Sequence, residues 1–175
     1  MHPRRRTSSA GAAQRGFFLI EALIAILIFS LGVLGLVAMG GAAIAAQSDA
    51  QYRTEAAALA DEIASKISLN VDRYNTANLY PNTAASIAAT LAPFEHQPGG
   101  NNCAFTGAAS ADPVVQAWVT KISSAGGLPG ATDTSQQIRI LTTNAGDFNR
   151  VSVTICWQAP SDRAVRQHTL ITYVN

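Results

Sequence analysis

The segment Arg15-Gly16-Phe17-Phe18-Leu19-Ile20-Glu21 opens a long apolar run, and from Ala22 to Ser48 the chain has no charged residue and no proline. A helix over Ala22–Ala46, at ~1.5 Å per residue, would be about 37 Å long, which exceeds the ~30 Å thickness of a hydrocarbon core. Glu21 is the exception, because a carboxylate in a membrane helix costs roughly 2.5–3.5 kcal/mol. A charge in this position is by default functional and needs a partner.

Two simpler interpretations of the apolar run stay open. A signal-anchor helix with an incidental glutamate would have the same hydropathy, but it would not require a basic leader, a Gly16-Phe17 junction and Glu21 together. A secretory signal peptide would be cleaved after small residues such as Ala43-Ile44-Ala45. The apolar core of such a peptide is normally ~7–15 residues long, whereas Phe17–Val37 is longer and contains an acid.

The segment from Gly16 to Glu21 resembles the class III signal of type IV prepilins and pseudopilins. The resemblance implies that a membrane-embedded prepilin peptidase cleaves between Gly16 and Phe17, and that the new amine of Phe17 is methylated. It also implies that Glu21 neutralises the Phe17 amine of a neighbouring subunit when helices bundle into a filament. Opposite charges in a poorly hydrated bundle lower each other's cost, which agrees with this role.

Charge is distributed unevenly along the 175 residues. The leader, residues 1–16, carries four arginines, and the part from Asp49 onward carries eight basic and ten acidic residues. A positive flank keeps the N-terminus in the cytoplasm. We therefore expect a cleaved leader over 1–16, a single inner-membrane span over 17–46 and a periplasmic domain over 47–175. The slightly acidic domain disfavours nucleic acid as a partner, because phosphate binding needs a basic patch.

The helix is expected to continue beyond the membrane. Gln47–Tyr74 has no glycine or proline, and its apolar residues recur every three or four positions, as in an amphipathic helix. These residues are Tyr52, Ala56, Leu59, Ile63, Ile67, Val71 and Tyr74. The sequence therefore predicts one helix from Phe17 to Tyr74, whose second half packs on an exported domain.

A shorter helix is predicted in the middle of the chain. Asn75–Ala111 is broken into turns by prolines and glycines, with a short helix over Ser86–Leu91. Asp112-Pro113 is typical of a helix start, with Asp as N-cap and Pro at the first position. The apolar face of Val115, Trp118, Val119 and Ile122 then continues to Ala125, and Gly126-Gly127 ends the helix.

The C-terminal third predicts strands. They are expected over Gln137–Thr143, Val151–Gln158 and Val165–Val174, with turns at 144–147 and 159–162. The middle segment alternates strictly, which predicts a half-buried strand. The fold class is therefore α+β: a long helix resting on a small antiparallel sheet of three or four strands, the lollipop-like design of pilins.

Cys103 and Cys156 both lie in the expected periplasmic part. In an oxidising compartment such a pair is by default a disulfide, and two unrelated thiols are the alternative. Alternation places Cys156 on the polar strand face, away from the main core, where it could meet the loop of Cys103. His2, His96 and His168 are scattered and there is no Cys-x-x-Cys, so no metal or other cofactor is expected.

Features after Asn102 resemble a minor pilin in particular. They are Cys103, the Asp112–Trp118 helix, Leu128-Pro129-Gly130 and the Val151–Trp157 strand. Major pilins usually have a proline midway along the long helix, where this chain has Ala38. The resemblance implies a low-abundance subunit of the tip or initiation complex of a type IV pilus. Its partners would be the major pilin, other minor pilins and a tip adhesin, and its role would be in adhesion, twitching motility or DNA uptake.

Three alternatives are weighed against this function. A minor pseudopilin of a type II secretion system has the same signal and an equally proline-poor helix. A membrane-anchored periplasmic enzyme is disfavoured, because the chain has no Gly-x-Ser-x-Gly, no phosphate-binding loop and no His-Glu-x-x-His, and His168 is expected on a solvated strand face. A DNA-binding pilin would need the arginines of the strands and turns to cluster. These are Arg139, Arg150, Arg163 and Arg166.

Overall fold

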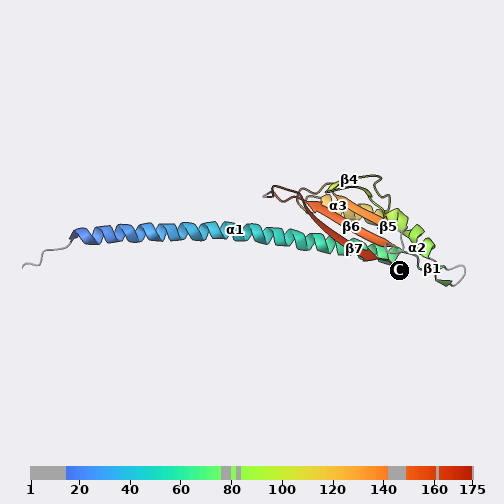
Figure 1. The fold of residues 1–175 in the computed structure, drawn as a ribbon, viewed down its shortest axis with the longest axis horizontal. Coiled ribbons are helices and arrows are strands. Elements are labelled where there is room, and N and C mark those ends of the chain that lie inside the picture. Colours follow the sequence, from blue (N-terminus) through green and yellow to red (C-terminus); the bar gives the residue numbers. More distant parts are fainter. Residues whose placement is uncertain (1–14, 76–79, 82–83, 142–148, 161, 175) are drawn as a thin grey trace, which may run out of the picture. The chain divides into compact units, whose positions relative to one another are not determined.

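The computed structural model describes residues 15–75, 80–81, 84–141, 149–160 and 162–174. Its first helix, α1, runs from Arg15 to Asn70 and has 56 residues, and all the other elements follow it in the chain (Figure 1). The chain divides into two compact units, Met1–Ala45 and Ala46–Asn175. The division lies within α1, next to the predicted end of the membrane segment at Ala46.

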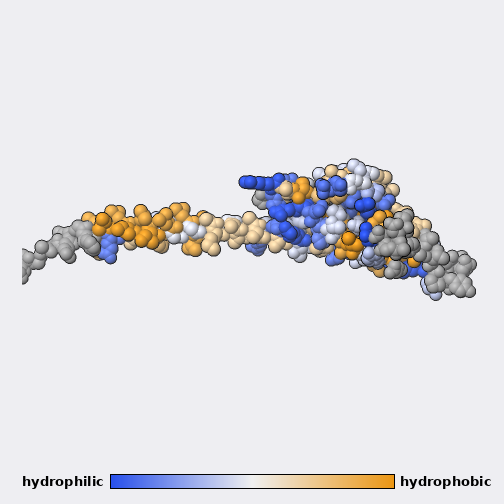
Figure 2. Space-filling view, viewed as in Figure 1, coloured by the Kyte–Doolittle hydropathy of each residue, from blue (hydrophilic) through white to orange (hydrophobic). Residues whose placement is uncertain are grey.

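In the first unit, α1 is an exposed apolar helix. From Phe18 to Ile44 its large apolar side chains are 41 to 74% exposed, and Figure 2 shows a hydrophobic surface along this part of the helix. The helix is long and apolar enough to cross a membrane, and its most apolar window is not buried within the protein. Water is a poor solvent for such a surface, and its length and composition are compatible with a membrane span.

In the second unit, α1 forms one wall of a hydrophobic core. Its buried residues are Ala56, Leu59, Ala60, Ile63, Ala64 and Ile67, and Tyr52 packs partly buried against the same core, which also includes Val71 just after the helix. The predicted amphipathic stripe is therefore confirmed from Tyr52 to Ile67, whereas Val71 is buried but follows the end of the helix. Tyr74 is 55% exposed and begins β1, Tyr74–Asn75. The helix ends at Asn70 because the Asp72 carboxylate accepts the backbone N–H of Tyr74 at 3.0 Å, a local turn that competes with helix.

A three-stranded antiparallel sheet shares this core. The strands are β5 (Gln136–Leu141), β6 (Arg150–Trp157) and β7 (Arg166–Tyr173), with β6 in the centre. Val151, Val153 and Ile155 of β6 are fully buried in the same cluster as the α1 residues. The expected α+β fold, with a long N-terminal helix and a small antiparallel sheet, is confirmed. Thr142, Thr143 and the predicted turn at 144–147 lie outside the described residues.

Burial on β6 differs from the prediction. Thr154 and Cys156 alternate with the core residues, yet Thr154 is 8% exposed and Cys156 is fully buried. As predicted, Cys156 lies on the strand face away from the main core and meets the Cys103 loop, but this face is buried and the strand is not half-buried. The reason is a β-hairpin, formed by β3 (Gly99–Asn101) and β4 (Ala104–Thr106), whose turn is joined to Cys156 by a disulfide.

The hairpin depends on unusual backbone angles. Asn102 and Cys103 form its two-residue turn with φ of 50° and 65°, the positive values that a type I′ turn requires. Gly100 also has a positive φ, and a Cβ there would lie 2.1 Å from the carbonyl oxygen of Ala104. Glycine is needed at that position because the two strands approach so closely.

The helix α3, Pro113–Ser123, begins as predicted. The Asp112 carboxylate accepts the N–H groups of Val114 and Val115 at 2.8 and 3.3 Å. The predicted apolar face is buried: Val115, Trp118, Val119 and Ile122. The helix ends at Ser123, before the predicted Ala125, because the chain turns back and the N–H of Leu128 donates to the carbonyl of Ile122 at 3.0 Å.

Short elements connect α1 to the hairpin. Strands β1 and β2 (Tyr80–Pro81) pair antiparallel, and α2 (Ala84–Leu91) is followed by a 3-10 turn, η1 (Ala92–Phe94). The predicted helix over Ser86–Leu91 is confirmed and begins at Ala84. Leu91 and Phe94 are buried, so this irregular region is attached to the core by apolar side chains.

Candidate functional site

The predicted processing and assembly residues lie on the first turns of α1. The helix begins at Arg15, so its backbone includes Gly16, Phe17 and Glu21. Phe17 and Glu21 are four positions apart, which places them on one helix face about one turn from each other. Glu21 is exposed, and within the described part of the chain it has no hydrogen bond or ion pair. The arrangement therefore presents a carboxylate at the start of an apolar surface.

Small residues shape the apolar part of α1. A Cβ added to any of its four glycines would meet no described atom within 4 Å outside the helix's own backbone. These glycines are Gly32, Gly35, Gly40 and Gly41, and alanines follow at a spacing of four at Ala38, Ala42 and Ala46. In a membrane or a helical bundle such positions let backbones approach closely. The surface is thus suited to contact with other helices as well as with lipid.

The disulfide joins Cys103 and Cys156, which are 53 residues apart in the sequence. The pairing predicted from the sequence is therefore present in the structure. It attaches the β3–β4 hairpin to the central strand of the sheet. In the chain-entropy model, closing a loop of this length stabilises the folded state by ~4 kcal/mol.

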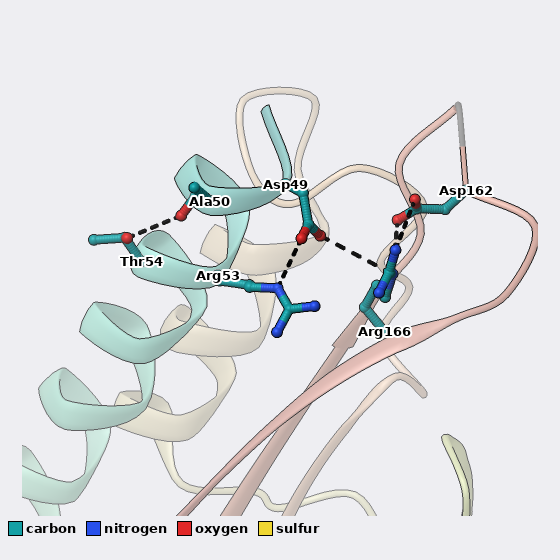
Figure 3. A network of polar contacts seen from close by, with 6 residues as sticks. All are labelled: Asp49, Ala50, Arg53, Thr54, Asp162 and Arg166. Atoms are coloured by element: carbon teal, nitrogen blue, oxygen red, sulfur yellow. Dashed lines mark hydrogen bonds and ion pairs between the residues drawn. The ribbon is translucent and has the colours of Figure 1, made fainter. Parts of the chain in front are cut away.

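A charged network joins α1 to the start of β7 (Figure 3). Asp49 accepts a hydrogen bond from Nε of Arg53 at 2.9 Å, and its other oxygen lies 4.0 Å from Nε of Arg166. Arg166 also donates to both carboxylate oxygens of Asp162, at 3.2 and 3.3 Å. The hydrogen bond to Asp162 and the nearby negative charges raise the pKa of Arg166. The network thereby brings the start of β7 next to the helix at Asp49.

This network was not predicted from the sequence. The spacing of Asp49 and Arg53, four positions apart on a helix, was a usable signal for their ion pair. No local signal connects Asp49 to Arg166, because the two residues meet only after the sheet has packed on α1.

The four arginines considered for DNA binding do not gather in one place. Arg139 and Arg150 lie toward the end of the sheet where β6 begins, whereas Arg163 and Arg166 lie at the end where β7 begins. The strand β6 separates these ends by about 23 Å, at ~3.3 Å per residue. Arg166 is also engaged by two carboxylates. Within the described residues, these four arginines therefore do not together form the basic patch that DNA binding needs.

The two described histidines are held in different ways. His96 is 4% exposed, its Nδ1 accepts the N–H of Ser110 at 3.2 Å and its Nε2 lies 3.4 Å from the carbonyl oxygen of Asp133. Burial lowers the pKa of His96, although Asp133 partly opposes the shift. His168 was predicted on a solvated face, and this is wrong: it is half-buried, because the register places it opposite Ile155 on the core side of the sheet. Among the residues that the structure describes, no three His, Cys, Asp or Glu residues gather as metal ligands.

Comparison with known proteins adds no assignment. A scan against protein-family models, a search of curated proteins and a search of solved structures found no match to this chain.

Proposed function

We propose that this protein is a minor subunit of a type IV pilus, made as a prepilin and most like the minor pilin PilV, the type IV pilus modification protein. One observation carries the proposal. A single helix, α1, exposes apolar side chains over its first part, where Glu21 is the one charged residue between Arg15 and Asp49, and supplies a wall of the domain core over its second part. Such a helix can serve in turn as a membrane anchor and as the core of a filament.

In this proposal the precursor is a single-pass protein of the inner membrane. The arginine-rich leader stays in the cytoplasm, and the domain from Gln47 onward lies in the periplasm. Prepilin peptidase cleaves after Gly16, and the amine of Phe17 is methylated. The protein is a structural subunit rather than an enzyme, and after assembly it is extracellular at the pilus tip, in contact with other minor pilins, the major pilin and a tip adhesin.

Glu21 is proposed to direct the assembly step. After cleavage the Phe17 amine and the Glu21 carboxylate stand about one helical turn apart. When parallel helices leave the lipid and pack together, the carboxylate of one subunit can neutralise the amine of the next. Each charge would be costly alone in a poorly hydrated bundle, and the pair removes much of that cost. The contact would also set how far neighbouring subunits are displaced along the filament.

The variant Glu21→Ala tests this role. We expect normal membrane insertion and leader removal, but about a tenth or less of the normal amount in sheared pili, because an unpaired buried amine costs several kcal/mol. Asp133→Ala, which removes an exposed acid far from α1 in the sequence, is the matched control and should assemble normally. Quantitative immunoblots of membranes and sheared pili provide the measurement. A Glu21→Ala variant present in pili at the wild-type level would contradict the pairing.

A minor pseudopilin of a type II secretion system is the second candidate. It is favoured by the uninterrupted course of α1 through Ala38, where a major pilin would usually have a proline. The two functions predict different losses in a deletion strain: pili and twitching in the first case, secreted enzymes in the second. Neighbouring genes separate them as well, since minor pilins and a large tip adhesin indicate a pilus, whereas a secretion ATPase and a secretin indicate secretion.

A further inference from the structure

The three-stranded sheet has one covered edge and one open edge. Along β5, His96 and Ile138 exchange two backbone hydrogen bonds of 3.0 and 2.9 Å. The side chain of Gln137 donates to the carbonyls of Gln97 and Gly99 at 2.8 and 2.9 Å. Along β7, the only backbone hydrogen bonds found within the described residues are those of the ladder with β6. The outer N–H and C=O groups of β7 are therefore open to another strand.

Apart from Arg166 at its start, which is paired with Asp162, the strand β7 lacks the features by which proteins usually protect a sheet edge. Its eight residues, Arg166–Tyr173, include no proline and no lysine, and its register with β6 runs without a bulge. Ile171 and Tyr173 are each 53% exposed on its outer face. A long, regular edge strand with exposed apolar side chains is a template for pairing with another chain.

A groove of about 460 Å³ lies between this edge and α1. Leu170, Ile171 and Thr172 line one side, and Asp61, Ala64, Ser65, Ser68 and Leu69 line the other. The middle of the helical wall consists of small residues, which leaves room beside the strand. Asp61 is exposed and has no ion pair or hydrogen bond within the described part of the chain, and Leu69 is 83% exposed.

We propose that this groove receives an extended segment of another polypeptide, which adds to the sheet as a fourth strand beside β7. The strand edge specifies an extended backbone, because only a strand presents N–H and C=O groups at the spacing that β7 requires. The small residues of α1 leave room for the side chains on the inward face of the segment. Ile171 and Tyr173 favour β-branched apolar side chains on its outward face, and Asp61 favours a lysine or arginine at one end.

This inference goes beyond the pilus assignment and does not depend on it. A strand contact at β7 uses only the second unit of the chain. Its test therefore has an outcome that is separate from that of the Glu21→Ala experiment.

A capped, fluorescein-labelled peptide, Lys-Val-Ala-Ile-Ser-Val-Lys, is the probe. The receptor is the full-length protein in lipid nanodiscs, and empty nanodiscs are the blank. We expect saturable binding by fluorescence anisotropy, together with slower hydrogen–deuterium exchange in β7. Two further peptides carry N-methyl groups on one backbone edge or on the other. The peptide methylated on the edge that faces β7 should bind about tenfold more weakly or not at all, and the other should bind as before.

Variants of the groove complete the test. Ser65→Trp fills the groove and should weaken binding about tenfold, whereas Ala58→Trp, at another exposed position of α1 outside the groove, should leave it unchanged. Asp61→Asn should weaken binding of the lysine peptide but not of an analogue with norleucine in place of lysine.

Three results would overturn the proposal. They are no saturable binding up to ~1 mM, equal affinities for the two N-methylated peptides, and protection of β7 by self-association of the protein alone. The last result would mean that a second copy of this chain covers the edge.

Discussion

At the scale of single residues, His96 shows how one buried polar side chain joins separate segments. It pairs with β5 through its backbone and accepts the N–H of Ser110 through Nδ1. Ser110 in turn donates from Oγ to the carbonyl of Pro93 and accepts the N–H of Asp112. A proton on Nδ1 would remove the acceptor of the Ser110 N–H, so the folded state favours the neutral imidazole.

Stability should therefore fall as the solution becomes acidic. The pKa of His96 is lowered on folding, mainly by burial. Below the unfolded value of ~6.5 the unfolded chain binds a proton that the folded chain does not, so stability decreases by up to ~1.4 kcal/mol per pH unit until the folded pKa is passed. Urea unfolding of the full chain in detergent, followed by tryptophan fluorescence between pH 7.5 and 5.5, measures this. His96→Gln should flatten the dependence, and an unchanged slope in that variant would assign it to other groups.

Asp112 is a second residue whose effect can be measured. Its carboxylate accepts two N–H groups at the start of α3, which otherwise have no partner in the helix. Asp112→Ala should reduce the free energy of unfolding by ~1 kcal/mol, whereas Asp112→Asn retains a capping oxygen and should lose much less. The urea midpoint compares them. Equal losses in the two variants would show that the cap is not the source of the effect.

At the scale of elements, the β3–β4 hairpin depends on its attachment to β6. Two strands of three residues are marginal alone, and the disulfide holds them on the central strand. Replacing both Cys103 and Cys156 by alanine should lower the free energy of unfolding by ~4 kcal/mol. Reductant should bring the wild-type protein to the same urea midpoint. A midpoint that neither change moves would mean that the hairpin is held by packing alone.

Elements with local signals could be predicted from the sequence. The stripe of α1, the Asp112 cap and the buried face of α3 follow from spacing within one segment. The end of α1 at Asn70 was missed, because a single side chain, Asp72, redirects the backbone. The burial of Cys156 was missed as well, because it depends on a hairpin that lies 53 residues away in the sequence.

At the scale of the whole molecule, α1 combines two environments in one helix. Its first part exposes large apolar side chains, and its second part forms a wall of a core shared with the sheet. The two parts could be predicted from hydropathy and periodicity. The network of Asp49 with Arg166 could not, because it forms only in the folded domain. The proposed filament role depends on the junction of leader and helix, at Gly16 and Phe17.

Mass spectrometry of the N-terminus of the protein purified from membranes tests that role most directly. We expect a mature chain that begins at Phe17 with a methylated amine, and a Gly16→Val variant that keeps its leader. A mature chain that begins at Met1 or at Ala46 would contradict prepilin processing and, with it, the proposed assembly function.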